Sequence, residues 1–419
     1  MNPPSTDITV VHPWDPYAPS IGGFDTFLDG FLRYAPNEWA IELIGITASP
    51  ESRPTGKWQT LDYGDRAVRF FPVLTDRTPN LVRKIPLSLR FALSARKHRV
   101  KATGRLLIYH RFESTFAVGP DASRQSSVVY LHNHPGEVRS PHSDVLWSRL
   151  PGLYARLLSR ALRRAALVVS VDPRTPAWVR QELPGWPGRA LWHQQWADPK
   201  VFFKGSAATR QAARVELRQR LEFPADTRIL VFAGRFEKQK DVPLLLEIFE
   251  QATSELENLG LILIGEGRLR PHLRKRIEER ELGRRVRILT PVPRAGLAKV
   301  YRGCDVAVCT SGFEAGPRFV FEAAACGLPV VSFDVGQVAR LVDHDLMFGS
   351  LVHDRTAAAF VGRLIAVMAT PTDDERADRC ARNAARFTPE SGLRPIIDAY
   401  TSLLGSDAGL LERPRRLRQ

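Results

Sequence analysis

The sequence predicts an α/β protein with two doubly wound domains. Short, continuous apolar runs recur along its 419 residues, as expected for strands that are buried on both faces of a parallel sheet. Segments of helix length, such as 240–257, lie between these runs and carry apolar residues at three- and four-residue steps. The strand–turn–helix pattern of residues 8–33 begins again at 228–250, which predicts a second domain of the same kind.

The expected strands share a short run of aliphatic and β-branched residues. After residue 370 this pattern stops, and helices are expected over 372–387 and 392–404. We place the domain boundary near residue 205, which gives domains over 1–204 and 205–388 and a terminal helix with a basic tail over 389–419. The expected strands are 8–12, 41–46, 68–73, 106–110, 126–132, 167–171, 228–233, 260–264, 286–290, 305–309 and 329–333.

The composition suits a folded chain of two or three domains and excludes a wholly disordered one. Hydrophobic residues make up 44% of the sequence. The N-terminus has no signal-peptide pattern, and no run approaches the roughly 18 apolar residues of a membrane-spanning helix. The four cysteines, Cys304, Cys309, Cys326 and Cys380, form no CxxC pair, and we interpret them as reduced thiols of a cytosolic protein.

Positive charge is concentrated in a few segments. The net charge is +15, and residues 66–111 contain twelve Lys and Arg residues against one acid, Asp76. The stretch 81–105 is interpreted as a helix started by Pro86. The last eight residues add four arginines against one glutamate. A further basic set has spacings that form a stripe on one helical face; it consists of Arg149, Arg156, Arg160, Arg163 and Arg164.

This charge distribution predicts an anionic partner. We favour an anionic membrane surface, because basic segments mixed with apolar residues are typical of membrane-surface docking. Simple solubility and nucleic-acid binding are the alternatives. The sequence has no RNP-like aromatic pattern, zinc finger or recognisable helix-turn-helix, so we expect no nucleic-acid partner.

Two glutamates eight residues apart, Glu314 and Glu322, flank the expected start of a helix. Pro317 fits the first helical position, and Gly316 leaves room for an anion at the helix amides. This spacing suits a binding site for a ligand that lies across the start of the helix. The helix amides would bind a phosphate, and a carboxylate would accept from paired hydroxyls such as those of ribose. The alternative is a first-turn acid that complements the helix dipole and a Glu322 that lies on the surface.

Three other constellations follow expected strands. Arg235 and Lys240 in GRFEKQKD suit a diphosphate without a metal, although a solvated charged turn is the alternative. The Gly22-Gly23 pair precedes an expected helix, where it suits either an approaching sugar phosphate or a plain turn. In VVYLHNHPGE, His132 and His134 would share one face of a strand, without the further ligands of a metal site.

A DxD pair, Asp343 and Asp345, is interpreted as a solvated turn rather than a metal site on a nucleotide-sugar. We therefore predict no metal ligands in this chain.

Taken in order along the chain, these segments resemble the retaining nucleotide-sugar glycosyltransferases of the GT-B fold, within the large family that carries an E-x7-E motif. The resemblance is closest over 228–342, in GRFEKQKDVPLLLEIF, LILIGEGRLRPHL and the run from Tyr301 to Val342. It is looser in the N-terminal half, at IGG, His132, LVVSV and DPKVF. Two positions depart from the family pattern: Arg340 stands where a glutamate is usual, and HQQWAD replaces an Asn-Gly turn.

The resemblance implies two Rossmann-like domains that face each other across a cleft, with C-terminal helices that cross back to the N-terminal domain. It implies that Arg235 and Lys240 bind the donor diphosphate in place of a metal. Glu322 would take the ribose hydroxyls, and Glu314, with the amides near Gly316, would hold the donor sugar.

In the N-terminal domain, Gly22 and Gly23 would close over the sugar and phosphate, and His132 would contact the sugar near the reacting carbon. The nucleotide base would lie near Gly265 and Val292. The resemblance assigns no cofactor beyond the nucleotide-sugar, which is itself a substrate.

The implied function is retaining transfer of a hexose, mannose or glucose, from a nucleoside-diphosphate sugar. Together with the charge distribution, the family resemblance suggests a glycan or lipid-linked acceptor and a peripheral enzyme at the cytoplasmic face of the cell membrane, in cell-envelope polysaccharide assembly. The alternative is a non-catalytic protein of the same fold that binds a nucleotide-sugar or a polyanion.

Overall fold

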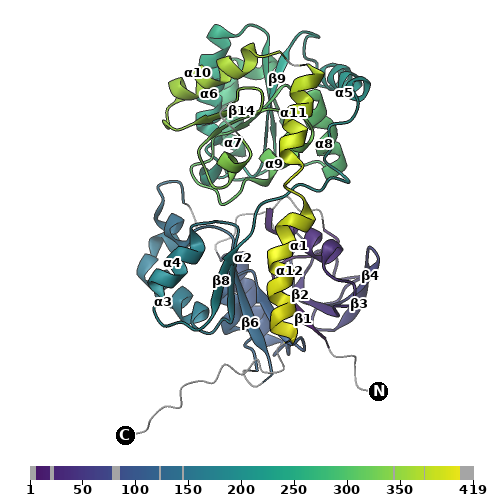
Figure 1. The fold of residues 1–419 in the computed structure, drawn as a ribbon, viewed down its shortest axis with the longest axis vertical. Helices are drawn as coiled ribbons and strands as arrows, with labels where there is room; N and C mark the ends of the chain where they lie inside the picture. Colours follow the sequence, from purple (N-terminus) through teal and green to yellow (C-terminus); the bar gives the residue numbers. More distant parts are fainter. Residues whose placement is uncertain are drawn as a thin grey trace.

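Two sheets of mainly parallel strands, each covered by helices, form the framework of the molecule (Figure 1). The computed structural model describes residues 6–18, 23–77, 85–121, 124–143, 146–342, 345–371 and 373–405. The predicted α/β architecture of two doubly wound domains is confirmed.

The N-terminal sheet has eight strands in the order β3-β4-β2-β1-β5-β6-β7-β8, and only β3 and β4 pair antiparallel. Because parallel strands end at a common edge, the residues that follow β1, β5 and β6 lie side by side. The strands are β1 (Ile8–Val11), β2 (Ile41–Thr47), β3 (Gln59–Tyr63), β4 (Arg66–Thr75), β5 (Leu106–Tyr109), β6 (Ser126–Leu131), β7 (Leu167–Ser170) and β8 (Arg189–Trp192).

The C-terminal sheet has six strands, all parallel, in the order β11-β10-β9-β12-β13-β14. The neighbours β9 and β12 are followed by the loops that contain Arg235 and Glu314, so this topology brings those two loops together. The strands are β9 (Arg228–Ala233), β10 (Leu259–Ile264), β11 (Val286–Leu289), β12 (Val306–Cys309), β13 (Val330–Phe333) and β14 (Gly349–Val352).

The helices cover both sheets and bury their apolar faces against them. In the N-terminal domain they are α1 (Gly23–Tyr34), α2 (Leu87–Lys97), α3 (Pro151–Leu162) and α4 (Thr175–Glu182). The others are α5 (Ala207–Arg220), α6 (Val242–Glu255), α7 (Arg270–Glu279), α8 (Arg294–Gly303), α9 (Arg318–Ala325), α10 (Ala357–Ala369), α11 (Asp374–Ala384) and α12 (Pro389–Gly405).

The last helix, α12, crosses back to the N-terminal domain, as predicted, and runs beside α1 (Figure 1). Its buried side chains Leu393, Ile396 and Tyr400 belong to the same apolar cluster as Phe31 of α1. The rings of Phe31 and Tyr400 lie 6.0 Å apart, edge to face. The chain is thereby anchored in the N-terminal core at both of its described ends.

All the expected strands are present, with ends that differ by one or two residues. Three strands were missed: β3, β8 and β14. β3 alternates exposed and buried residues at the edge of the sheet, β8 is a half-buried edge strand, and β14 is short and begins with glycine. None of the three carries the continuous apolar run that is typical of a central parallel strand.

Two expectations about basic helices were wrong in extent. The helix that begins after Pro86 ends at Lys97 rather than continuing toward residue 105, because the chain turns at Arg99, where φ is +46°. The arginine stripe is not a single helical face, since only Arg156 and Arg160 lie within α3. Its five arginines are nevertheless all exposed.

A short segment that follows β8 joins the two domains through buried hydrogen bonds. The side-chain amide of Gln337, which is fully buried, donates to the carbonyls of Val171 and His193 in the N-terminal domain. Its oxygen accepts from the backbone N–H of Gln195 at 2.9 Å. The Gln195 side chain donates in turn to the carbonyl of Gly316 at 2.8 Å. We call these five residues, Val171, His193, Gln195, Gly316 and Gln337, the interdomain junction.

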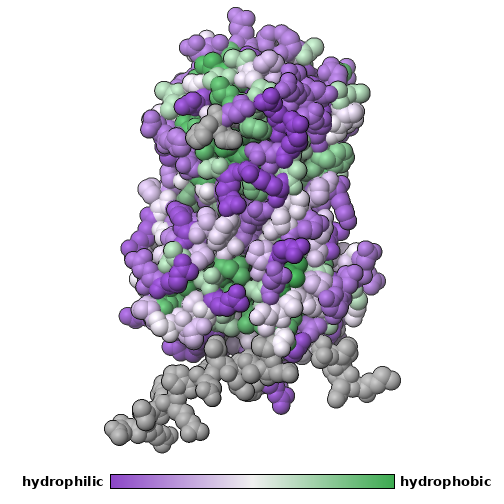
Figure 2. Space-filling model, viewed as in Figure 1, coloured by the Kyte–Doolittle hydropathy of each residue, from purple (hydrophilic) through white to green (hydrophobic). Residues whose placement is uncertain are grey.

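Polar and apolar side chains are interspersed over the visible surface (Figure 2). Among the residues that the structure describes, no helix is both long and apolar enough to cross a membrane.

Asp305, which precedes β12, is a buried anchor of the C-terminal domain, and its loss is expected to destabilise the fold strongly. Its carboxylate accepts from Arg218 at 2.9 Å, Arg214 at 2.8 Å and the N–H of Ile229 at 2.8 Å. Asp305→Ala leaves the buried Arg218 without its anion, so the free energy of unfolding is expected to fall by about 3–5 kcal/mol in denaturant titration.

The matched control is Glu216→Ala, which removes an exposed carboxylate from its pair with Lys299 and should change stability little. Equal effects of the two substitutions would contradict the role assigned to Asp305.

Candidate functional site

Four histidines each follow the last residue of a strand in the N-terminal sheet. His12 follows β1, His110 follows β5, His132 follows β6 and His193 follows β8. The rings of His110, His132 and His193 lie around Tyr130, with centroids 4.8, 4.4 and 5.6 Å from its ring. The ring of His12 lies 5.6 Å from that of His110. We call these four residues the histidine cluster.

The histidine cluster is held together by hydrogen bonds. Nδ1 of His110 lies 3.0 Å from Nε2 of His132. Nδ1 of His193 donates to the carbonyl of Gln194 at 2.9 Å, so its Nε2 accepts from the Tyr130 hydroxyl. Nε2 of His12 lies 3.5 Å from a carboxylate oxygen of Asp25.

Burial keeps the histidine cluster neutral. Desolvation is the main cause that lowers the pKa of each of its members, and for His193 it lowers the pKa to about 3. Neighbouring histidines and Arg111 lower the pKa of His110 and His132 further. At pH 7 all four rings are therefore uncharged hydrogen-bonding groups.

Two arginines from opposite domains, Arg111 and Arg235, lie near each other. Arg111 follows His110, and its guanidinium lies over the ring of Phe24 at 5.1 Å. Desolvation lowers its pKa most, and Arg235 of the C-terminal domain also lowers it. Arg235 is exposed, and within the described part of the chain no acid forms an ion pair with it. The two charges suit an anion that lies between the domains.

The loop that joins β12 to α9, residues 310–317, carries Glu314, and we call it the Glu314 loop. Lys240 and Glu314 form an ion pair whose two side chains are 14% and 8% exposed. The side chain of Gln239 donates to the carbonyl of Phe313 at 3.1 Å, which ties the loop after β9 to the Glu314 loop. The structure thus brings the predicted residues Lys240 and Glu314 together.

Helix α9 begins one residue later than predicted, at Arg318, with Pro317 as its N-cap. It ends at Ala325, and Gly327 follows with φ of +83°, a conformation that glycine adopts readily. Glu322 lies in the fifth position of the helix and is only 5% exposed. The alternative of a surface glutamate is therefore wrong.

Glu322 is 5% exposed, and no hydrogen bond to its carboxylate is found among the described residues. Burial raises its pKa, while Arg318 and Arg294 lower it and Asp198 raises it. Arg318, also buried, has its pKa lowered to about 10 by desolvation. A buried carboxylate with free acceptor oxygens is suited to a ligand that brings hydroxyl donors.

The predicted donor glycines play different structural roles. Gly265 follows β10 with φ of +157°, and a Cβ there would lie 1.9 Å from the carbonyl oxygen of Gly234. Gly316 lets the Glu314 loop pack on the N-terminal domain, since a Cβ would lie 3.2 Å from side-chain atoms of Val171 and Gln195. Gly23 begins α1, and a Cβ there would meet no atom within 4 Å.

The other donor-site positions are distributed as follows. Val292 lies between β11 and α8 and packs against the C-terminal core. Gly22 lies outside the described residues, as do Asp343 and His344. Asp345 is described, and it accepts from the N–H of Met347 at 2.9 Å and lies 3.5 Å from Arg379.

His132 and His134 do not share a face, contrary to expectation. β6 ends at Leu131, so the two-residue alternation does not continue through both histidines. His134 instead caps a 3₁₀ turn, η2 (Pro135–Arg139), by accepting from the N–H of Gly136 at 3.1 Å. Within the described ranges, no group of three or more His, Cys, Asp or Glu residues suits a metal ion.

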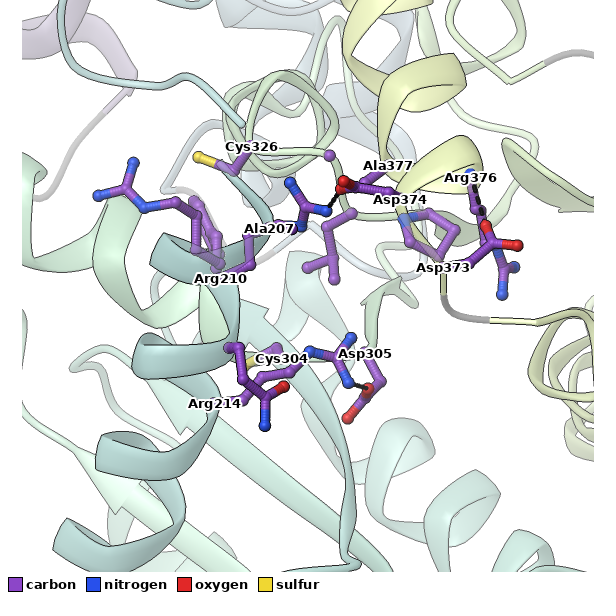
Figure 3. Close-up of a pocket in the computed structure, with 16 residues that line it drawn as sticks. Ala207, Arg210, Arg214, Cys304, Asp305, Cys326, Asp373, Asp374, Arg376 and Ala377 are labelled. Atoms are coloured by element: carbon purple, nitrogen blue, oxygen red, sulfur yellow. Dashed lines mark hydrogen bonds and ion pairs between the residues drawn. The ribbon is translucent and has the colours of Figure 1, made fainter. Parts of the chain in front are cut away.

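A pocket of about 270 Å³ lies at the opposite end of the C-terminal sheet, among α5, α8, α9 and α11 (Figure 3). The pocket is lined by Asp305, which precedes β12. Glu314 follows β12, so the pocket and Glu314 lie at opposite ends of that strand. Two of the pocket's arginines are paired with acids, Arg214 with Asp305 and Arg210 with Asp374, whereas Arg302 and Arg376 donate to backbone carbonyls. None of the predicted donor-binding residues lines this pocket, so it is not the diphosphate site that the sequence predicts.

Sequence reasoning missed His12, His110 and His193, together with Arg111. A signal for them exists, because each histidine directly follows an apolar strand, in VVH, IYH and LWH. The carboxyl ends of strands in an open α/β sheet are where ligands bind. What the sequence does not contain is the strand order that makes these ends neighbours.

The pKa shift of Glu322 predicts how stability changes with pH. A raised pKa means that the folded protein binds more protons than the unfolded chain between pH 4.5 and the raised value. Stability therefore falls as pH rises through that window and stays reduced above it. Glu322→Gln lacks this penalty, so its melting temperature should exceed that of the wild type at pH 8, with the difference shrinking toward pH 4.

The measurement is thermal unfolding from pH 4 to pH 8, with the exposed Glu278→Gln as the control for losing one carboxylate. A difference between Glu322→Gln and the wild type that is constant over this range would contradict the assignment.

Residues 213–387 match the family described as Glycosyl transferases group 1. A D-inositol 3-phosphate glycosyltransferase of Xylanimonas cellulosilytica is 33% identical over 196 residues, which cover 45% of this chain and 45% of that protein. The protein of the same name from Mycobacterium tuberculosis is 28% identical over 269 residues, 62% of this chain and 51% of that one. The chain thus spans about half the length of these curated relatives.

Solved structures resemble almost the whole chain. Sucrose-phosphate synthase from Thermosynechococcus elongatus is 19% identical, with a TM-score of 0.72 over 95% of this chain and 99% of that one. HepE from Anabaena, in complex with UDP and glucose, is 18% identical, with a TM-score of 0.66 over 95% of this chain and 100% of that one. Residues 213–387 are therefore similar to the glycosyl transferases group 1 family, and the chain as a whole has the GT-B fold.

Proposed function

We propose that this protein is a retaining glycosyltransferase that moves a hexose, mannose or glucose, from a nucleoside-diphosphate sugar to a glycan or lipid-linked acceptor. The observation that carries the proposal is the arrangement around the Glu314 loop. The unpaired Arg235, the Lys240–Glu314 ion pair and the buried carboxylate of Glu322 lie on neighbouring loops and one helix of a group 1 domain. Together they offer cations for a diphosphate and acceptors for hydroxyls.

In this proposal the donor exchanges partners with the protein. Lys240 leaves Glu314 for the diphosphate, and the freed carboxylate accepts from hydroxyls of the sugar. Arg235 binds the same diphosphate, and Glu322 accepts from the ribose hydroxyls. Charge stabilisation of the departing nucleoside diphosphate then comes from side chains, so that the reaction needs neither a metal ion nor a cofactor.

The chemical step is a front-face displacement with retention at the anomeric carbon. The acceptor oxygen bonds to that carbon as its bond to the phosphate oxygen breaks, and the departing phosphate takes the acceptor proton. The protein contributes mainly by positioning the two substrates and by stabilising charge. His132 contacts the donor sugar in this arrangement, and Gly23 borders the sugar and phosphate.

The relatives support a nucleotide-sugar donor. HepE was solved with UDP-glucose and with UDP, and the curated relatives are named as glycosyltransferases. Under this proposal the nucleotide base lies near Gly265 and Val292, at the carboxyl ends of β10 and β11.

The acceptor side of the proposal rests on the surface of the N-terminal domain. Helix α2 contacts η1 (Phe112–Phe116), and η1 contacts α3. Apolar side chains are exposed on these elements and beside them: Ile85 52%, Leu93 66%, Phe116 37%, Leu150 49% and Leu153 46%. Exposed basic residues accompany them: Arg96, Lys97, Arg149, Arg156 and Arg160. We call these residues the α2–α3 face and propose that it docks on anionic lipid at the cytoplasmic face of the membrane.

Nucleotide binding is expected without added metal. UDP, GDP, ADP and TDP are each added to the purified protein in the presence of a chelator, and unfolding is followed by thermal shift. A ligand that binds only the folded state stabilises it by RT ln(1 + [L]/Kd), about 2.7 kcal/mol at a hundred times Kd. We expect one nucleotide to raise the melting temperature by several degrees.

Arg235→Ala should abolish that shift, and the exposed Arg274→Ala on α7 is the matched control. Failure of all four nucleotides to shift the wild type would argue against the donor site. If Glu314→Ala still supports the biological function of the protein in full, the non-catalytic alternative is favoured.

Vesicle binding tests the α2–α3 face. Sedimentation with vesicles that contain phosphatidylglycerol is expected to capture the wild type at low salt, and much less at high salt, because salt screens the basic residues. Replacing Arg96 and Lys97 by Gln, together with Leu93→Ser, should reduce the bound fraction severalfold. Replacement of Lys275 and Arg284 in the C-terminal domain by Gln is the control, and equal losses in the two variants would refute the proposal.

A further inference from the structure

His132 is held on several sides by aromatic neighbours. Its ring centroid lies 3.8 Å from that of Phe24 and 4.4 Å from that of Tyr130. Its Nε2 contacts Nδ1 of His110, whose own ring is 3% exposed. His132 itself is half-buried, and among the described residues its Nδ1 has no hydrogen-bond partner. Of its two nitrogens, only Nδ1 is therefore available to a substrate.

Two neutral imidazoles that share a hydrogen bond hold one proton between their facing nitrogens. If the proton lies on His110, His132 must carry its own proton on Nδ1 and can only donate to a substrate. If the proton lies on Nε2 of His132, its Nδ1 has a lone pair and can only accept. The His110 contact therefore decides what His132 can do.

The surrounding charges favour the second arrangement. The guanidinium of Arg111 lies 5.1 Å from the ring of Phe24, whose centroid is 3.8 Å from that of His132, and Arg235 approaches Arg111 from the other domain. A lone pair is attracted to these cations, whereas an N–H directed toward them is repelled. The other neighbours do not oppose this: His193 is fixed by the carbonyl of Gln194, and His12 faces Asp25.

We propose that His110 is a positioning residue that fixes the tautomer of His132. Nε2–H of His132 donates to Nδ1 of His110, and the lone pair on Nδ1 of His132 accepts a hydrogen bond from a hydroxyl of the donor sugar. This inference deepens the proposed function and rests on it for the identity of the ligand, but the tautomer itself is a property of the unliganded protein.

The tautomer is measured directly on the unliganded protein. Long-range proton–nitrogen correlation spectra of histidine labelled with ¹⁵N distinguish a protonated ring nitrogen from a bare one. Assignment uses His132→Gln, in which one ring system disappears. We expect Nε2 of His132 to be protonated and Nδ1 bare in the wild type. A protonated Nδ1 overturns the proposal.

Two variants of His110 separate positioning from packing. In His110→Asn the side-chain oxygen replaces Nδ1 as the acceptor, and in His110→Phe the ring remains but the acceptor is lost. His110→Phe should leave His132 as a mixture of tautomers, whereas His110→Asn should keep Nε2 protonated. An unchanged tautomer in His110→Phe also overturns the proposal.

Turnover gives the second readout, with UDP-glucose and GDP-mannose as probes and nucleotide release as the signal. His110→Phe is expected to lower kcat about 10- to 100-fold with a smaller change in KM, the range seen when an orienting partner is lost elsewhere. His110→Asn should recover most of the loss. His272→Asn on the exposed surface of α7 is the control.

The two proposals fail differently. If the wild type turns over neither probe, the proposed donor chemistry fails, while the spectra still decide the tautomer. If turnover is present but His110→Asn and His110→Phe lose it equally, His110 supports only packing and the positioning role is refuted.

Discussion

The buried side chain of Gln337 determines how the two domains meet, and the rest of the site depends on that placement. Its amide is bonded only to backbone groups of the other domain: the carbonyls of Val171 and His193 and the N–H of Gln195. Backbone groups at strand ends move little relative to their sheet, so this contact transmits the orientation of one sheet to the other. Breaking it would leave several buried polar groups unpaired, which is costly. The HQQWAD segment, which departs from the family pattern, supplies most of these contacts.

The two sides of the interdomain junction have contrasting electrostatics. The N-terminal side presents mainly neutral rings, because four histidines are gathered at strand ends, with the cation of Arg111 beside them. The C-terminal side presents cations, of which Lys240 is paired with Glu314 and Arg235 is not. A neutral surface that donates and accepts hydrogen bonds suits hydroxyl groups, and a cationic one suits phosphate. A molecule with a sugar at one end and a diphosphate at the other complements both surfaces.

The sequence predicted those features whose residues are contiguous in the chain. The central strands were found because they are apolar throughout, and Glu314, Glu322, Arg235 and Lys240 because short motifs carry them. Features that need tertiary information were not found. The edge strands β3 and β8 are half polar, and the burial of Glu322 depends on Arg318 and on a segment of the other domain. The histidine cluster draws on β1, β5, β6 and β8, and β1 and β5 are neighbours only because β2, β3 and β4 lie on the other side of β1.

The packing of the Glu314 loop couples ligand binding to domain orientation. Ala315 is 3% exposed and belongs to the apolar cluster of the N-terminal domain, although its neighbours in sequence belong to the C-terminal one. Gly316 is bonded to Gln195, and Gly336 approaches the carbonyl of Ala315 closely. Any rotation of one domain against the other must therefore displace Glu314. If the orientation of the domains changes the affinity of a ligand for Glu314, binding of that ligand must change the equilibrium between domain orientations. The free energy of coupling is the same in both directions.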